Sequence, residues 1–324
     1  MGNLRNGVYM SMPGKKIAFL FPGQGSQSVG MGRDLVTSFP KIKQIFDDVD
    51  EICGKSISRL CFEGPMEELT ITENLQPAVT AANLACLRAL KESGVHPQVS
   101  AGHSLGEYAA LVSVGVVSPY DALRLVQKRG QLMQREAIAN PGSMMAVIGM
   151  GWDAVSEVVT RVEAEGVVSI ANHNTAAQIV ITGETAALSQ AVQLIKEKGG
   201  KAIPLRVSGA WHCKLMEGAV GEFRRFLEDV TFFEPQTEML FNATAGNESD
   251  PEKIKDLMAE QLINPVRWYE IVLEMLQKGV HTFVEVGPKR VLSGLVKKIV
   301  PSGGTVKIYN VEGLESLKDF LKEN

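Results

Sequence analysis

One short segment near the start of the chain limits the fold more than any other. Residues 17–21 read IAFLF, an unbroken apolar run, and Pro22 and the glycine-rich letters GQGSQ follow at once. A strand with one solvated face alternates apolar and polar residues, whereas a continuous apolar run is typical of a strand covered on both faces. Because parallel sheets are covered in this way, the segment predicts an α/β fold with a mainly parallel sheet.

The next part of the chain supplies helices and a second strand for this sheet. Residues 34–53 and 76–93 carry apolar side chains at helical spacing. Residues 96–104, HPQVSAGHS, then predict a short strand, and residues 105–117 predict a buried helix. Ser104 therefore falls between a strand and a helix.

The middle of the chain has a different order of predicted strands and helices. Its segments predict a strand (143–150), a helix (153–166), two strands joined by a turn (167–184), a helix (185–199) and a strand (201–208). The order βαββαβ is that of ferredoxin-like domains. We therefore interpret residues 139–207 as an inserted subdomain, residues 17–138 and 208–324 as one α/β domain, and residues 1–16 as an N-terminal extension.

Composition excludes several classes of function. The 33 Lys and Arg residues and 37 Asp and Glu residues give a net charge of −4 and are interleaved along the chain, so nucleic acid is not the expected partner. The four cysteines show neither CxxC pairing nor metal-ligand spacing with the histidines, which favours reduced thiols and no metal. No run approaches the roughly 18 apolar residues of a membrane-spanning helix. We expect a cytoplasmic protein that is a monomer and binds no membrane.

The letters GHSLG at residues 102–106 match G-x-S-x-G. In that pattern the glycines let a strand turn sharply into a helix and expose the serine, and backbone N–H groups at the start of the helix face a developing oxyanion. An ordinary tight turn is the alternative. The predicted strand before Ser104 and the predicted helix after it favour a nucleophile.

A serine nucleophile needs a base. The five candidates are His96, His103, His173, His212 and His281. His103 adjoins the serine, where direct proton abstraction is awkward, whereas His212 follows the insert at the point where the chain returns to the main domain. His212 is therefore favoured, and a solvated loop histidine is the alternative reading.

Two further features have both a functional and an ordinary reading. The loop after the first strand fails G-x-G-x-x-G, because Ser28 stands at the third glycine position, and it contains no P-loop. It can present N–H groups to an oxyanion or serve as a structural turn. Arg129 lies on an apolar helical stretch, where it either clamps a substrate carboxylate or extends to solvent.

Seven motifs in order give a specific resemblance. They are FPGQGSQ, GHSLGEYAAL, QKRGQLMQ, GSMMAVIG, ANHNTAAQIVITG, HCKLM and QLINPVRW. From Ile17 to Val300 the chain resembles the malonyl-CoA:acyl carrier protein transacylases of fatty acid synthesis. The resemblance implies a hydrolase-like α/β core with a ferredoxin-like insert, and transfer of malonyl from malonyl-CoA to acyl carrier protein without cofactor or metal.

The resemblance also implies roles for individual residues. Ser104 would take the acyl group, His212 would be its base, and Arg129 would bind the malonyl carboxylate. The remaining implied residues are Gln24 and Leu105 as backbone oxyanion donors, Gln261 as the residue whose main-chain carbonyl orients the base, and Asn172 and His103 as lesser contributors to the pocket.

One stretch departs from the commonest family forms. Trp211 precedes His212 where Phe or Ser is more usual, so the four letters ending at the histidine are GAWH. This stretch is closer to the pattern associated with malonyl than to the tyrosine-led pattern associated with methylmalonyl. The tryptophan leaves the size of the pocket open.

Two other functions use similar sequence features. A serine esterase or thioesterase would want an acid between the serine and the histidine, and Asp121, Asp153 and Glu163 do not stand out as candidates. A non-catalytic carrier-binding module could keep the fold, but an intact serine, histidine and arginine argue against that reading. Four cations in residues 289–298, namely Lys289, Arg290, Lys297 and Lys298, would aid docking of an acidic carrier, or form a solvated helix face.

Overall fold

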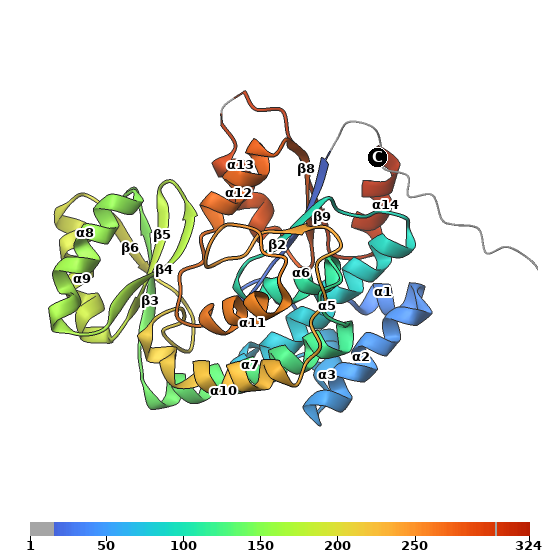
Figure 1. Cartoon of the computed structure of the whole chain (residues 1–324), viewed down its shortest axis with the longest axis horizontal. Coiled ribbons are helices and arrows are strands. Elements are labelled where there is room, and N and C mark those ends of the chain that lie inside the picture. Colours follow the sequence, from blue (N-terminus) through green and yellow to red (C-terminus); the bar gives the residue numbers. More distant parts are fainter. Residues whose placement is uncertain (1–15, 302) are drawn as a thin grey trace, which may run out of the picture.

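The computed structural model describes residues 16–301 and 303–324. Its central feature is a five-stranded sheet with the order β7-β2-β1-β8-β9 (Figure 1), and each neighbouring pair is parallel. The strands are β1 (Lys16–Phe21), β2 (Val99–Gly102), β7 (Glu238–Met239), β8 (Val280–Val286) and β9 (Lys307–Val311). The predicted parallel sheet is confirmed. The predicted extension, apart from Lys16, lies outside the described residues.

Strand β1 shows why an unbroken apolar run was needed. Ala18, Phe19, Leu20 and Phe21 are each fully buried. Phe19 and Phe21 belong to one apolar cluster, whereas Ala18 and Leu20 belong to another. Because successive side chains of a strand point to opposite faces, both faces of the sheet are packed.

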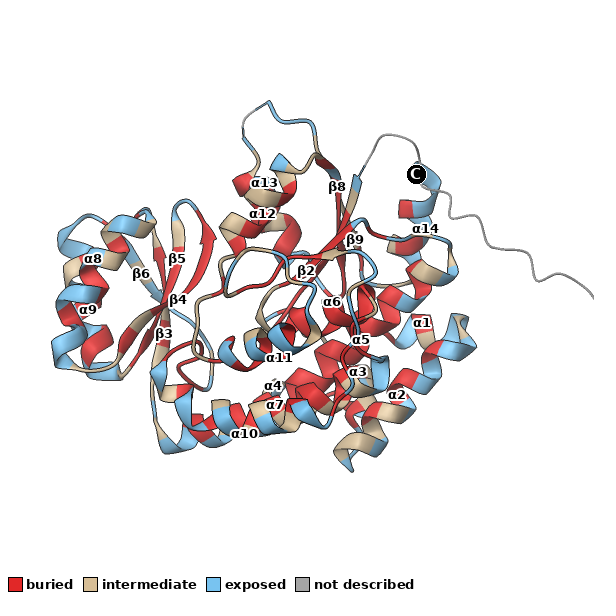
Figure 2. Ribbon diagram, viewed as in Figure 1, coloured by how far each residue is buried: buried red, intermediate tan, exposed pale blue. Residues whose placement is uncertain are grey.

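Helices cover the two faces of this sheet. The helices that follow β1 and β2 are α1 (Arg33–Ser38), α2 (Pro40–Cys53), α3 (Ile57–Glu63), α4 (Met66–Thr70), α5 (Thr72–Glu92), α6 (Glu107–Ser113) and α7 (Pro119–Ala139). The later ones are α10 (Glu217–Glu228), α11 (Pro251–Glu260), α12 (Trp268–Gln277), α13 (Val291–Ile299) and α14 (Leu314–Glu323). Figure 2 shows α5 buried along most of its length, as expected for a helix in the centre of the larger core.

A second sheet forms the lobe on the left of Figure 1. Its antiparallel order is β4-β5-β3-β6, and its elements are β3 (Ser143–Ile148), α8 (Trp152–Val162), β4 (Val168–Thr175), β5 (Gln178–Gly183), α9 (Thr185–Glu197) and β6 (Lys201–Pro204). This chain order is the predicted βαββαβ. All six elements lie within residues 139–207, and those limits stay a prediction for the subdomain.

The second lobe packs against the main core through the face of its sheet that α8 and α9 leave uncovered. Met144, Ala171 and Val180 belong to the larger cluster of the main domain, whereas the face under α8 and α9 has its own cluster. Strand β4 is also bonded to the main domain, since the His173 N–H donates to the Val266 carbonyl at 2.9 Å and the Val266 N–H donates to the Ala171 carbonyl at 2.8 Å. Among the described residues, no helix has the length and apolar character needed to cross a membrane.

Candidate active site

Ser104 lies in a sharp turn between β2 and α6. Its backbone φ is +50°, which is uncommon for a residue with a side chain. The turn requires glycine on both sides of Ser104, because other backbone atoms come too close there for a side chain. A Cβ at Gly102 would lie 1.9 Å from the carbonyl carbon of Gly106, and a Cβ at Gly106 would lie 1.9 Å from the carbonyl oxygen of Phe21. The predicted strand, turn and helix around the serine are therefore present.

Asn242 fastens this turn from the segment after β7. Its amide donates to the Gly102 carbonyl at 2.7 Å, and its Oδ1 accepts from the Ser104 N–H at 2.6 Å. Asn242 is fully buried. No sequence motif pointed to this residue, which lies 138 positions from the serine.

His212 meets the serine as predicted. Its Nε2 lies 2.8 Å from Ser104 Oγ, and its Nδ1 lies 2.8 Å from the main-chain carbonyl of Gln261. Because a carbonyl can only accept, Nδ1 carries the hydrogen and Nε2 is left to accept the serine proton. Burial, and then the charge of Arg129, lower the pKa of His212 to about 3. The imidazole is therefore neutral, as a base must be.

Arg129 comes from α7 and does not extend to solvent. Its side chain is 1% exposed, which excludes the solvated reading. One terminal nitrogen donates to Gln76 Oε1 at 2.9 Å, and the other donates to Gln261 Oε1 at 2.9 Å and to Ser104 Oγ at 3.3 Å. A buried, fixed guanidinium thus lies beside the Ser104 hydroxyl.

Gln261 connects these groups. Its main-chain carbonyl holds His212, its Oε1 accepts from Arg129, and its Nε2 donates to the Ser104 carbonyl at 3.0 Å. The same Nε2 donates to Glu107. The family resemblance implied a role for the Gln261 carbonyl, but not for its side chain.

The loop after β1 lies against the serine turn. A Cβ at Gly23 would lie 2.4 Å from the His103 carbonyl and 3.5 Å from the Leu105 nitrogen, so the loop approaches as closely as glycine allows. Within the described residues, the N–H groups of Gln24 and Leu105 have no hydrogen-bond acceptor. Both are therefore available to an oxyanion, and this use remains a prediction.

The two lesser residues of the predicted pocket differ in their surroundings. The His103 Nε2 lies 2.9 Å from Asn174 Oδ1, and its ring centroid lies 5.5 Å from that of Trp268. Asn172 is buried two residues earlier on β4. The contact with His103 thus comes from Asn174, which was not among the predicted residues, and a role for Asn172 stays a prediction.

Trp211 is accommodated by its neighbour Gly209. The indole is 4% exposed and belongs to the larger apolar cluster. A Cβ at Gly209 would lie 2.6 Å from the indole and 2.7 Å from the Cβ of Ala137. The glycine of GAWH therefore makes room for the tryptophan to pack into the core.

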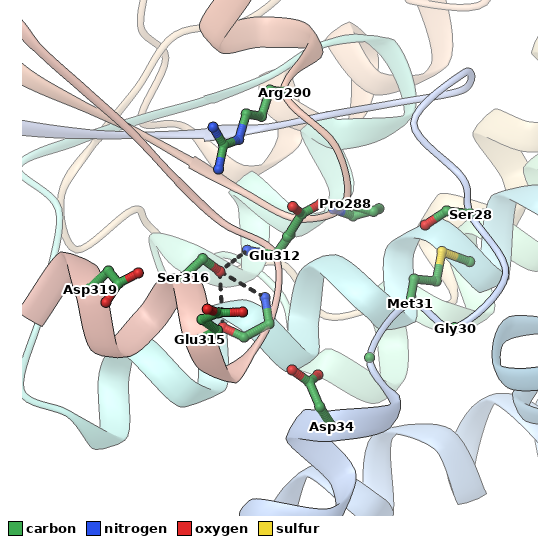
Figure 3. A pocket seen from close by; sticks show the side chains of 12 residues that line it. Ser28, Gly30, Met31, Asp34, Pro288, Arg290, Glu312, Glu315, Ser316 and Asp319 are labelled. Carbon is green, nitrogen blue, oxygen red and sulfur yellow. Dashed lines mark hydrogen bonds between the residues drawn. The ribbon is translucent and has the colours of Figure 1, made fainter.

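A separate pocket of about 510 Å³ lies between the loop after β1, at Ser28 and Met31, and the start of α14 (Figure 3). Its ionisable lining residues are Asp34, Arg290, Glu312, Glu315 and Asp319. Lys289 donates from Nζ to the Gly25 carbonyl at 3.2 Å. Two of the four cations expected to dock a carrier thus have partners or carboxylate neighbours within the protein, and docking through this helix stays a prediction.

Comparison with known proteins identifies the chain. The acyl transferase domain family model matches residues 18–317, so the fold and the site define an acyltransferase. The malonyl CoA-acyl carrier protein transacylase of Bacillus subtilis is 43% identical over 310 residues, which cover 95% of this chain and 98% of that relative. This chain belongs to the malonyl CoA-acyl carrier protein transacylase family, and the predicted resemblance is confirmed.

Solved structures agree with this membership. An acyl carrier protein S-malonyltransferase from Vibrio cholerae is 41% identical with a TM-score of 0.90, and the match covers 94% of this chain and 100% of that one. A malonyl-transacylase in complex with its type II PKS acyl-carrier protein is 39% identical with a TM-score of 0.91, and the match covers 96% and 100% of the two chains.

Proposed function

We propose that this protein transfers the malonyl group of malonyl-CoA to the phosphopantetheine thiol of an acyl carrier protein, as in fatty acid synthesis. One observation carries the choice of acyl group: the buried Arg129 guanidinium lies 3.3 Å from the Ser104 hydroxyl. A malonyl group on the serine ends in a carboxylate one methylene beyond its ester carbonyl. A planar guanidinium suits that carboxylate better than an ammonium group, because it can donate two parallel hydrogen bonds.

The first half-reaction loads the serine. His212 Nε2 takes the hydroxyl proton as Ser104 Oγ attacks the thioester carbonyl of malonyl-CoA. The backbone N–H groups of Gln24 and Leu105 stabilise the oxyanion. The carbon–sulfur bond then breaks, the leaving sulfur takes the proton from His212, and coenzyme A departs from a malonyl-serine ester.

The second half-reaction reverses these steps with a different thiol. The phosphopantetheine thiol gives its proton to His212, and its sulfur attacks the ester carbonyl. The bond to Ser104 Oγ breaks, and the oxygen recovers the proton from His212. Every step uses only side chains, backbone N–H groups and the two thiols, so we propose that the reaction needs no cofactor or metal.

A serine hydrolase is the second candidate, and the environment of His212 argues against its usual form. The partner of His212 Nδ1 is a main-chain carbonyl, whereas most serine hydrolases use an acid there. Of the acids between the serine and the histidine, Asp121 is bonded to Ser118 and Arg124 at the start of α7, and Asp153 and Glu163 are exposed on the second lobe.

One experiment separates the candidates. The protein is incubated with malonyl-CoA, and its intact mass is measured with and without a phosphopantetheinylated carrier protein. A transferase gains one malonyl group and passes it to the carrier. A hydrolase releases malonate without the carrier, and a non-catalytic binding module gains no mass. The cytoplasm remains the predicted location.

A further inference from the structure

Glu107 is a buried carboxylate that the proposed reaction does not use. It is the first residue of α6, lies three positions after the serine, and is 1% exposed. Its Oε1 accepts from the Asn242 N–H at 2.5 Å, and its Oε2 accepts from the Gln261 amide. Both oxygens of this carboxylate therefore bind residues that themselves hold the serine turn.

The buried charge of Arg129 explains why a carboxylate is needed nearby. In the described part of the chain, Arg129 forms no salt bridge. It donates to the neutral oxygens of Gln76, Gln261 and Ser104, and its guanidinium carbon lies 5.6 Å from the centre of the Tyr108 ring. A buried charge is costly unless an opposite charge or good hydrogen bonds compensate it. When ionised, Glu107 provides this opposite charge. The side-chain amide of Gln261 lies between the two groups and forms a hydrogen bond with each.

The amide of Gln261 has two chemically different ends, and Glu107, together with the Ser104 carbonyl that accepts from the same Nε2 at 3.0 Å, determines which end faces Arg129. An ionised carboxylate can only accept, so Gln261 must present its NH₂ group to Glu107. The carbonyl end then faces Arg129 and accepts from it. The reversed amide would place NH₂ against a guanidinium that can only donate, and a carbonyl oxygen against a carboxylate.

We propose that Glu107 is a positioning residue for malonyl selectivity: through the Gln261 amide it fixes the orientation of Arg129 and supplies the compensating charge. The inference rests on the proposed function, because Arg129 is taken to bind the malonyl carboxylate. Burial raises the pKa of Glu107 to about 8, and the Asn242 N–H, the Gln261 amide and Arg129 each oppose this rise and so favour the ionised carboxylate. The ionised form of Glu107 is thus stabilised by the same groups that Glu107 holds in place.

The test compares Glu107→Gln with the wild type at about pH 8.5, where more than half of a group with a pKa of about 8 is ionised. Glutamine keeps the size of the side chain but removes the charge. It also replaces an acceptor by an amide that can donate, which leaves the Ser104 carbonyl to hold the NH₂ end of Gln261. The rates of Ser104 acylation by malonyl-CoA and acetyl-CoA are measured by intact mass over a range of concentrations. We expect the malonyl-to-acetyl ratio of kcat/KM to fall about tenfold or more, mainly through a higher KM for malonyl-CoA.

Glu285→Gln is the matched control. Glu285 is also 1% exposed, and its oxygens accept from the Leu292 and Ser293 N–H groups at 2.9 and 2.7 Å, at the start of α13. Its loss should lower the melting temperature and leave the malonyl-to-acetyl ratio unchanged. A ratio unchanged in Glu107→Gln, or lowered equally in Glu285→Gln, would overturn the proposal.

Two further variants test the proposal even if Glu107→Gln does not fold. If Glu107→Gln does not fold, Glu107→Asp keeps the charge but shortens the side chain, and it should lower the ratio about threefold or more; a wild-type ratio would count against the proposal. In an Arg129→Ala background, changing Glu107 should have no further effect on the ratio. Failure of the wild type to form malonyl-serine would instead reject the proposed function.

Discussion

Replacing Arg129 with alanine should remove the preference for a malonyl group while leaving the reaction at the serine possible. The guanidinium is held by hydrogen bonds of 2.9 Å to Gln76 and Gln261, so alanine removes a cation that was fixed before substrate arrived. The 2.8 Å contact between Ser104 and His212 does not involve the arginine. A neutral acyl group should therefore still be able to react.

The expected size of the effect follows from the type of contact. A charge-assisted bidentate hydrogen bond in a site with little water contributes about 2–4 kcal/mol, which corresponds to roughly 30- to 1000-fold in kcat/KM. Arg129→Lys should recover only part of this, because an ammonium group cannot donate the planar pair. In the alanine variant, the oxygens of Gln76 and Gln261 lose their donor, at about 1–3 kcal/mol each if they remain unpaired. The melting temperature is therefore measured alongside the rates.

The assay compares malonyl-CoA with acetyl-CoA as donors for the wild type and both variants, with the carrier protein in excess. In Arg129→Ala, kcat/KM for malonyl-CoA should fall by the stated factor, and the value for acetyl-CoA should stay level or rise. A proportional loss for both donors would refute the reasoning. Arg129 would then be a structural residue, and malonyl selectivity would need another source.

Four further predictions concern the serine turn and His212. Ser104→Ala should fold and gain no malonyl mass; an adduct on this variant would place the nucleophile elsewhere. Because the pKa of His212 is lowered to about 3, its neutral form persists in acid, so kcat/KM should show no inflection near the ordinary histidine pKa of about 6.5 in a pH titration. Its contribution to folding stability is present above about pH 6.5 and is lost as the pH falls toward 3, which acid unfolding of the wild type and His212→Gln would compare. Gly106→Ala should lower the free energy of unfolding in urea by about 2 kcal/mol or more, whereas Gly294→Ala, whose Cβ meets nothing within 4 Å, should be neutral or stabilising; equal effects would contradict the packing argument.

The sequence predicted those parts of the fold and site that depend on neighbouring residues. The apolar run of β1 indicated a strand packed on both faces, and the two glycines around Ser104 indicated a turn that no larger residue can form. The βαββαβ order was readable because each of its elements has its own periodicity. The contact of His212 with the serine followed from the chain returning to the main domain at that point.

The supporting polar residues could not be predicted in the same way. Asn242 and Gln261 lie 135 and 154 positions from Glu107, and their roles arise only when three distant segments meet. An asparagine in a loop or a glutamate at the start of a helix has many ordinary explanations, such as a turn or a favourable interaction with the helix dipole. Only the folded structure distinguishes these explanations.

The hydrogen bonds between β4 and Val266 join the smaller lobe directly to the main domain. The next residue, Arg267, donates from its backbone to the Asn242 carbonyl at 3.1 Å, so a single short segment is bonded to the lobe on one side and to the support of the serine turn on the other. A hinge motion of the smaller lobe away from the main domain would have to break the backbone hydrogen bonds of Val266 and Arg267. We therefore expect substrates to enter and leave while the two lobes keep their relative positions, and the shape of the entrance to depend on side chains at its rim.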